Sequence, residues 1–309
     1  MTTATIIAAV LTAVFAVIGP GLARRLPPAA ATRLLVPASL VVAASGVWVL
    51  IAVAFTWVAQ FQVVSRYGDW SAEQVRAGTP FPTVIAVACC LLAVLALGRA
   101  TVAGTRRVRV LLAVRQSCRH VGEPGSLVVL DNDRPDAFAT PGARGRIVVT
   151  TGLLRALTAD ERRALLAHEA SHLRHRHAWW LLAAELAVAA NPMLSSTVRA
   201  IGHAVERWAD EDAARAVTDR RLVARTLART ALLIRAAAPS QALPATGGDV
   251  PGRVRALLEP PPRPRVVPLA VLAALLVATT LAAGTVQRRG DELLDQAGTY
   301  SPPAATVRH

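Results

Sequence analysis

The sequence has no lysine, few aromatic residues and little charge for its length. All 34 basic residues are arginine, 20 residues are acidic, and the net charge is +14. Charged residues make up 17% of the 309 positions, whereas soluble proteins carry about 25%. Hydrophobic residues make up 53%, and the mean hydropathy is +0.42. This composition excludes a disordered chain and indicates that much of the protein lies in a lipid bilayer.

Cysteine is also scarce. There are three cysteines, and two of them, Cys89 and Cys90, are adjacent within an apolar run. This number and spacing exclude a disulfide framework and a cysteine zinc site. The fold therefore depends on packing and on the bilayer.

Four uncharged apolar stretches, at residues 2–23, 34–65, 77–98 and 266–287, are long enough to cross a bilayer as helices. They predict four transmembrane helices. In the first stretch the arginines follow the apolar core and do not precede it, which is not the pattern of a cleaved secretory signal. We therefore expect an uncleaved anchor.

The arginines also predict an orientation. The first connecting loop contains Arg24, Arg25 and Arg33 and no acidic residue, whereas arginines in the second loop are balanced by acids. Cytoplasmic loops carry the arginine excess. We therefore expect the first loop and residues 99–265 in the cytoplasm, and a short tail, 288–309, outside.

Residues 99–265 form the largest segment between predicted membrane helices. Arginines outnumber acids in it, but they are scattered, with few aromatics and no nucleic-acid-binding motif. We therefore expect no direct nucleic-acid binding and attribute the basic charge to contact with anionic lipid. The predicted elements are strands at 126–130 and 146–150, a helix capped by Thr158, helices at 194–217 and 220–237, and a linker at 238–268.

The capped helix contains a pattern typical of zinc peptidases. His168 and His172 are four residues apart, so both imidazoles project from one helical face and reach one metal ion. Glu169 lies beside them, where it can accept a proton from a water that the metal activates. The sequence therefore predicts a zinc site with His168 and His172 as ligands and Glu169 as catalytic base.

A catalytic zinc ion needs a third protein ligand. Residue 178, where a third histidine of an extended motif would stand, is alanine. The better candidate is Glu206, which shares a helical face with Asp210, so that Asp210 can hold the free ring N–H of a ligand histidine. His203 is a rival ligand.

Two further histidines, His175 and His177, follow the motif closely. They point progressively away from the metal-binding face, and we expect them to be exposed polar residues at the end of the helix.

The segment 178–198 is apolar except for Glu185. A single membrane crossing there would leave His172 and Glu206 on opposite sides of the bilayer. We therefore expect either a buried helix broken near Asn191 or a shallow hairpin that dips into the membrane, and Glu185 favours the buried alternative with a partner.

Together these segments resemble integral-membrane zinc metallopeptidases, a group that includes the CAAX prenyl proteases, the HtpX-type quality-control proteases and the BlaR/MecR-type antirepressor peptidases. The resemblance covers roughly residues 136–219 and rests on residues 138–142, 147–150, 152–154, 168–172, Glu206 and 209–210. It implies His168, His172 and Glu206 as zinc ligands, Glu169 as base and Asp210 as supporting acid. An arginine often lies near the active site in this group, and Arg253 is the candidate here.

The resemblance implies a mainly α integral membrane protein of the bacterial plasma membrane, with an α+β zincin-like (gluzincin) peptidase domain in the cytoplasm and one Zn²⁺ per chain. The expected function is a zinc endopeptidase that cleaves a protein substrate, such as a transcriptional repressor, bound in extended form along the strand at 147–150. The absence of lysine excludes the Ser-x-x-Lys nucleophile of β-lactam sensors. The alternatives are a quality-control protease and a non-catalytic zinc-binding receptor or scaffold.

Overall fold

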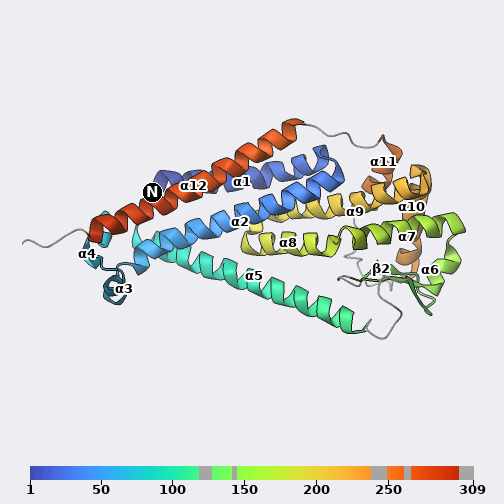
Figure 1. The fold of residues 1–309 in the computed structure, drawn as a ribbon, viewed down its shortest axis with the longest axis horizontal. Helices are drawn as coiled ribbons and strands as arrows, with labels where there is room; N and C mark the ends of the chain where they lie inside the picture. Colours follow the sequence, from blue (N-terminus) through green and yellow to red (C-terminus); the bar gives the residue numbers. More distant parts are fainter. Residues whose placement is uncertain (118–126, 141–144, 238–248, 261–265, 299–309) are drawn as a thin grey trace, which may run out of the picture.

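The computed structural model describes residues 1–117, 127–140, 145–237, 249–260 and 266–298. Within these residues the chain is mainly α-helical, with one three-stranded sheet at one end of an elongated molecule (Figure 1). The α-helices are α1 (Thr2–Arg25), α2 (Pro28–Val58), α3 (Gln62–Tyr67), α4 (Ala72–Gly78), α5 (Thr83–Ser117), α6 (Thr151–Ala156), α7 (Ala159–Arg174), α8 (His177–Ala190), α9 (Ser195–Val217), α10 (Arg220–Ala237), α11 (Val250–Leu258) and α12 (Val266–Gly298). The strands are β1 (Leu127–Leu130), β2 (Ala137–Ala139) and β3 (Ile147–Thr150), and a 3-10 turn, η1, spans Pro192–Leu194.

Four of the described helices, α1, α2, α5 and α12, are long and apolar enough to cross a membrane. The predicted fold class, a mainly α membrane protein, is therefore confirmed. The ends of the helices differ from the predicted spans. Helix α2 begins at Pro28, which occupies a first-turn position where a helix tolerates proline. Helix α5 begins only at Thr83, after Pro80 and Pro82.

Helix α5 continues without interruption past residue 98, where the sequence suggested the border of a separate domain. It packs against α2 and α8, and its last turns extend toward the end of the molecule that carries the sheet (Figure 1). The helix connects the apolar half of the molecule to the other end, so no structural break separates the two parts at this border.

The segment 178–198 folds as a helical hairpin. Helix α8 ends at Ala190, and α9 returns from Ser195. Between them, the side-chain oxygen of Asn191 accepts a hydrogen bond from the Met193 backbone N–H. Helix α9 packs against α1 and α2, and α8 packs against α2 and α5. Residues of α1, α2, α8 and α9 share one apolar core that includes Phe15, Leu35 and Ile201. The break near Asn191 was predicted from the sequence, and the helices on either side of it contact each other. Glu185 has an ion-pair partner, Arg107 of α5, at 3.5 Å.

Helix α9 lies very close to α1. A Cβ atom at Gly19 would come within 2.3 Å of Thr197 Oγ1, so only glycine allows this approach. The hydroxyl groups of Ser196 and Thr197 donate hydrogen bonds to the Ala16 carbonyl at 3.2 and 3.4 Å. These contacts fix the helix that carries Glu206 against a candidate membrane helix.

The sheet has the strand order β1-β3-β2, with β3 parallel to β1 and antiparallel to β2. The expectation that the strand at 147–150 is an edge for substrate is wrong, because β3 is the central strand. The edge beside α7 is β2. Thr140 N–H donates to the Arg146 carbonyl, and Thr150 N–H donates to the Asp136 carbonyl. Antiparallel bonding alternates along a strand, so Ala137 and Ala139 direct their backbone N–H and C=O groups to the edge that no described strand covers.

The region 238–268, interpreted from the sequence as a linker, contains helix α11. Asp249 caps it by accepting a hydrogen bond from the Gly252 backbone N–H at 2.9 Å, and Pro251 occupies its first turn. These are ordinary helix-start signals that the proline-rich surroundings obscured. Residues 238–248 and 261–265 of this region lie outside the described residues.

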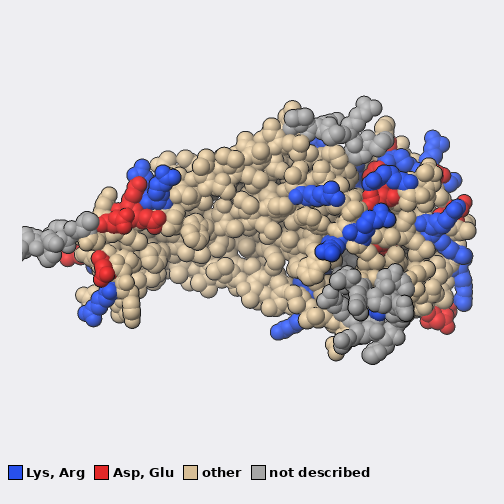
Figure 2. Space-filling view, viewed as in Figure 1, with Lys and Arg blue, Asp and Glu red and all other residues tan. Residues whose placement is uncertain are grey.

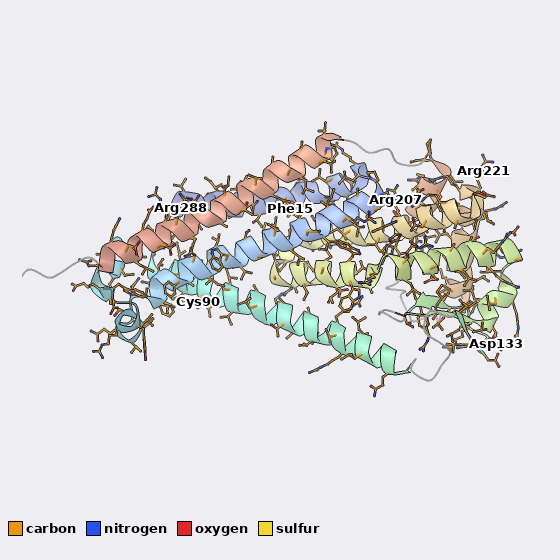
Figure 3. The ribbon with its side chains drawn as sticks, viewed as in Figure 1. Phe15, Cys90, Asp133, Arg207, Arg221 and Arg288 are labelled. Atoms are coloured by element: carbon orange, nitrogen blue, oxygen red, sulfur yellow. The ribbon has the colours of Figure 1, made fainter. Side chains whose placement is uncertain are left out.

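Charged side chains lie toward the two ends of the molecule, and the face in view is largely free of them in between (Figure 2). In Figure 3, Arg288 lies at one end, Asp133 and Arg221 lie at the other, and Phe15 lies in the apolar middle. The loop between α1 and α2 faces the half of the molecule that carries the sheet, as Figure 1 shows. An uncharged belt between two charged ends is the distribution expected of a protein that spans a bilayer.

Candidate metal centre

Helix α7 carries the two histidines of the motif, and its start is fixed by a capping box. Thr158 Oγ1 accepts a hydrogen bond from the Glu161 backbone N–H at 3.3 Å, and Glu161 Oε2 accepts one from the Thr158 backbone N–H at 2.8 Å. Arg229 of α10 donates to the same carboxylate at 2.9 Å. The cap predicted from the sequence is confirmed, and it fixes the first turn of α7, a helix that packs against β2 and β3.

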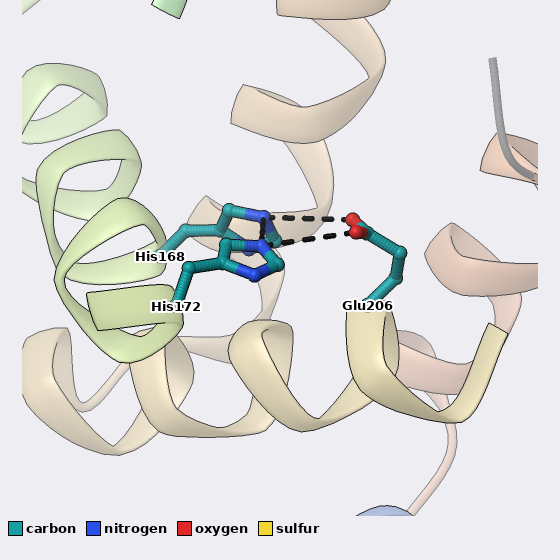
Figure 4. A group of neighbouring side chains, drawn as sticks. All are labelled: His168, His172 and Glu206. Atoms are coloured by element: carbon teal, nitrogen blue, oxygen red, sulfur yellow. Dashed lines mark hydrogen bonds and ion pairs between the residues drawn. The ribbon is translucent and has the colours of Figure 1, made fainter. Parts of the chain in front are cut away.

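His168, His172 and Glu206 converge at one point between α7 and α9 (Figure 4). The Nε2 atoms of the two histidines are 3.1 Å apart. Glu206 Oε2 lies 3.7 Å from His168 Nε2, and Glu206 Oε1 lies 3.8 Å from His172 Nε2. The structure therefore brings together the three residues that the sequence suggested as ligands.

These distances fit a single zinc ion. Two ligand atoms at about 2.0–2.1 Å from a tetrahedral ion lie roughly 3.3 Å apart, and the separations here are 3.1, 3.7 and 3.8 Å. Two imidazole nitrogens and one carboxylate oxygen are the ligand set of many catalytic zinc sites, which keep the fourth position open. The residues present thus match the metal in both chemistry and spacing.

A buried carboxylate and a buried guanidinium support this group. Asp210 Oδ1 lies 3.0 Å from His168 Nδ1, on the side of the ring away from Glu206. Arg253 of α11 donates to both oxygens of Asp210, and its Nη1 lies 2.9 Å from Glu206 Oε2. Carboxylates in this position fix the tautomer and orientation of a ligand histidine.

The charges in this network shift the pKa values of its members. Burial opposes the charged form of Asp210, but its hydrogen bonds with Arg253 and His168 outweigh burial and hold the pKa of Asp210 at about 2. Burial would lower the pKa of His168, but the hydrogen bond to Asp210 and its charge raise it overall. Asp210 is therefore an anion that favours a proton on His168 Nδ1 and leaves Nε2 directed at the candidate metal position.

His175 and His177 do not lie where the sequence suggested. Arg176 adopts a left-handed conformation with φ of 53°, which separates α7 from α8 and turns both histidines inward. His177 is 1% exposed, and its Nδ1 lies 2.9 Å from His172 Nδ1. His175 Nε2 lies 2.8 Å from Asp212 Oδ2. The expectation of exposed polar residues is wrong because the left-handed residue Arg176 interrupts the regular helix, so the residues after it do not follow the periodicity of α7.

Glu169 is adjacent to the ligand His168 and is buried. It is 9% exposed, and burial raises the pKa of its carboxyl group. Next to it is a cavity of about 310 Å³. Besides Glu169 and the ligand residues, the cavity is lined by residues of α5, β2, the end of α7 and the start of α8: Arg107, Ala137, Phe138, Ala139, Leu173, Arg176, His177, Ala178, Trp179 and Leu181. An extended segment paired with the edge strand β2 would run past Glu169.

Two further residues suggested from the sequence, His203 and Arg253, have different places in the structure. His203 is exposed and does not belong to the group of potential metal ligands found among the described residues. Arg253, suggested only by resemblance, is 8% exposed at the centre of the network. The contact of His177 with His172 was missed. No helical periodicity predicts it, because the two residues lie on either side of the break at Arg176.

Comparison with known proteins identifies the segment that carries the motif. Residues 105–193 match the model of Peptidase family M48. The resemblance to membrane zinc metallopeptidases is thereby confirmed for this segment. The M48 segment contains His168, Glu169 and His172 but ends before Glu206. The grouping of Glu206 with the two histidines therefore rests on the distances in the structure.

Several M48-like relatives are named HtpX proteases. The chain is 44% identical over 80 residues to a Protease HtpX homolog of Aeropyrum pernix, a match that covers 25% of each chain. It is 40% identical over 86 residues to a Protease HtpX homolog of Acidiphilium cryptum, covering 27% of this chain and 30% of the relative. The similarity thus spans about a quarter of the length of these relatives. No solved structure matches the chain significantly.

Proposed function

We propose that this protein is a membrane-embedded, zinc-dependent endopeptidase. The observation that carries the proposal is the convergence of His168, His172 and Glu206 within 4.8 Å of one another, beside a buried Glu169 in the M48-like segment. These three side chains would hold one Zn²⁺. Asp210 would hold His168 in its ligand tautomer, and Arg253 would fix the carboxylates of Asp210 and Glu206.

When bound, zinc supplies Lewis acidity that lowers the pKa of a water molecule and polarises the scissile carbonyl group. Glu169 acts as the general base. It accepts the proton of the attacking water and later delivers that proton to the nitrogen of the leaving amine. Burial raises the pKa of Glu169, and a base whose pKa approaches the working pH is more effective.

The substrate would bind as an additional strand along β2. The backbone groups of Ala137 and Ala139 point to this edge, and both residues line the cavity next to Glu169. Strand addition uses backbone hydrogen bonds and so requires an extended, locally unfolded substrate segment. This requirement favours damaged or partly unfolded proteins over compact ones.

A quality-control role is favoured because the relatives that match the M48-like segment are named HtpX proteases. The antirepressor-like role, with a transcriptional repressor as substrate, is the second candidate; what favours it is the presence of candidate membrane helices both before and after the metal centre. The two roles differ in the number of substrates. A quality-control protease cleaves many proteins, whereas an antirepressor peptidase cleaves one.

We place the metal centre on the cytoplasmic side of a bacterial plasma membrane. Arg33, at the start of α2, stacks on Trp208 of α9 with its guanidinium carbon 4.6 Å from the ring centre. The arginine-rich loop between α1 and α2 therefore lies on the same side as the site, and such loops favour the cytoplasm. Cysteine labelling at position 33 in intact cells would contradict this orientation if a membrane-impermeant reagent reacted there.

The test combines metal analysis with a base-deficient variant. The purified full chain should contain one zinc per chain and should cleave an unfolded test protein. Glu169→Gln should retain zinc and lose 10²–10⁴-fold in rate, whereas Glu259→Gln, which alters an exposed glutamate after α11, should behave as wild type.

Three results would contradict the proposal. Wild-type protein without zinc would exclude the site, and cleavage by Glu169→Gln at the wild-type rate would exclude the mechanism. Zinc without any cleavage, in the test protein or in a comparison of protein termini from wild-type and Glu169→Gln membranes, would favour a receptor or scaffold.

A further inference from the structure

The two histidines of the metal group have different partners on their outer ring nitrogens. His168 Nδ1 faces the carboxylate of Asp210 at 3.0 Å. His172 Nδ1 faces another imidazole nitrogen, His177 Nδ1, at 2.9 Å. Nothing in the proposed function assigns a role to His177, although it is 1% exposed and lies in direct contact with a proposed ligand.

The contact between His172 and His177 has only two possible arrangements of its proton. In one, His172 Nδ1–H donates to His177, and His172 Nε2 then has a free electron pair. In the other, His177 Nδ1–H donates to His172, and the His172 proton is on Nε2, where it blocks a metal bond. Only the first arrangement leaves His172 able to bind a metal ion through Nε2, the atom that faces His168 and Glu206.

The first arrangement requires the proton of His177 to be on its Nε2 atom. Among the described residues, Nε2 of His177 is buried without a hydrogen-bond partner. A buried ring nitrogen without a partner is uncommon. Within the described part of the chain, the contact of Nδ1 with His172 is thus the one hydrogen bond that the His177 ring makes.

Aromatic rings hold His177 in place. The Trp208 ring lies 4.8 Å from it at 56°, and the His175 ring stacks on it at 5.7 Å and 28°. Arg33 covers Trp208 at 4.6 Å. A ring that is packed in this way has little freedom to rotate, so its Nδ1 atom remains aimed at His172.

We propose that His177 is a positioning residue for the metal centre: its Nδ1 accepts the hydrogen bond of His172 Nδ1–H and so directs His172 Nε2 toward the zinc ion. The inference rests on the proposed function, because it assigns His172 as a ligand. The Nδ1 atoms of the two histidine ligands then have different hydrogen-bond partners: the carboxylate of Asp210 for His168 and the imidazole of His177 for His172.

Three variants of the full chain separate the hydrogen bond from packing. His177→Phe keeps a ring and removes the acceptor. His177→Asn removes the ring but places a carbonyl oxygen near the former Nδ1 position. His177→Gln carries the same amide group farther out, near the former Nε2 position, where it does not reach His172.

Zinc affinity is the main readout, measured on detergent-solubilised protein by competition with a chromogenic chelator. We expect His177→Phe and His177→Gln to bind zinc 10–100-fold more weakly than wild type, as found when the partner of a ligand histidine is removed. His177→Asn should stay within a few-fold of wild type. His203→Gln, which alters an exposed histidine of α9, should not change the affinity.

The visible spectrum of the Co²⁺-loaded protein provides a second readout that a loss of packing alone would not change. His177→Phe and His177→Gln should shift the bands of the bound ion, and His177→Asn should not. Wild-type affinity and spectrum in His177→Phe would overturn the inference, as would equal weakening in the Asn and Gln variants. Because Asn and Gln lose the same ring, their comparison remains decisive if the Phe variant does not fold.

The same experiment separates this inference from the proposed function. If wild type binds no zinc, the proposed function itself fails. If wild type binds zinc and Glu169→Gln abolishes cleavage while His177→Phe binds zinc normally, only the role of His177 is contradicted.

Discussion

Arg253 of α11 and Asp210 of α9 form a bidentate ion pair in the interior of the protein. Arg253 Nε lies 2.8 Å from Asp210 Oδ2, and Arg253 Nη2 lies 2.7 Å from Asp210 Oδ1. The two side chains are 9% and 3% exposed. The pair attaches α11 to the helix that presents Glu206, and so it connects a segment far along the chain to the metal centre.

Replacing Arg253 with methionine should destabilise the protein strongly. The change leaves Asp210 buried with only His168 as a partner, and removing one member of a buried ion pair costs about 3–5 kcal/mol. We expect a lower free energy of unfolding, measured by denaturant titration of the detergent-solubilised chain, together with weaker zinc binding. Arg255→Met, at an exposed position of the same helix, is the control, and equal stability of the two variants would contradict this role for the pair.

Removing the cap of α7 should lower stability by a smaller amount. Thr158→Ala deletes the hydroxyl that accepts from the Glu161 backbone N–H, and loss of such a cap costs about 1 kcal/mol. Unfolding midpoints measured by circular dichroism should fall accordingly. Thr105→Ala, in the exposed middle of α5, should leave the midpoint almost unchanged, and an equal decrease in both variants would refute the capping explanation.

The same cap should contribute to stability in a pH-dependent way. The hydrogen bond from the Thr158 backbone N–H lowers the pKa of Glu161; burial opposes this shift, and Arg229 adds to it. Since the folded-state pKa lies below the ordinary value of about 4.3, the contribution is complete above that value. It is lost as the pH falls through the folded-state pKa. Glu161→Gln should therefore unfold with a shallower dependence on pH below about 4.3, and an unchanged slope would contradict the assignment.

A change at the edge of β2 should affect substrate binding but not zinc binding. Ala139→Pro removes a backbone N–H that points to the edge beside the cavity, and it leaves the bonds between β2 and β3 in place. We expect a higher KM for an unfolded test protein with zinc content unchanged. Ala139→Ser, which keeps the N–H, should resemble wild type. If both variants retain the wild-type KM, substrate does not bind along this edge.

Much of the architecture was predictable from local sequence. Apolar runs without charge predicted four membrane helices, because a bilayer requires about 20 apolar residues in succession. The cap at Thr158 and the spacing of His168 and His172 are features of a few consecutive residues. Local signals also gave the position of the helix break at Asn191, although they left open whether the segment is a buried broken helix or a hairpin.

Contacts between distant segments decided the rest. Strand order depends on which strands pair, so the sequence did not reveal that β3 is central and β2 is the edge. Arg253 reaches Asp210 across 43 positions of the chain, and a proline-rich environment concealed the helix that carries it. His177 reaches His172 only because Arg176 turns the backbone.

The sequence by itself determined which chemistry this protein can carry out: two histidines and a glutamate on one helix, in a chain with four apolar spans. Only the tertiary structure decided how the metal centre is completed. Glu206, Asp210, Arg253 and His177 come from other helices, and their positions depend on the packing of α9 against α1 and of α11 against α9. Helical periodicity acts over a few residues, whereas packing brings together side chains that no local pattern connects.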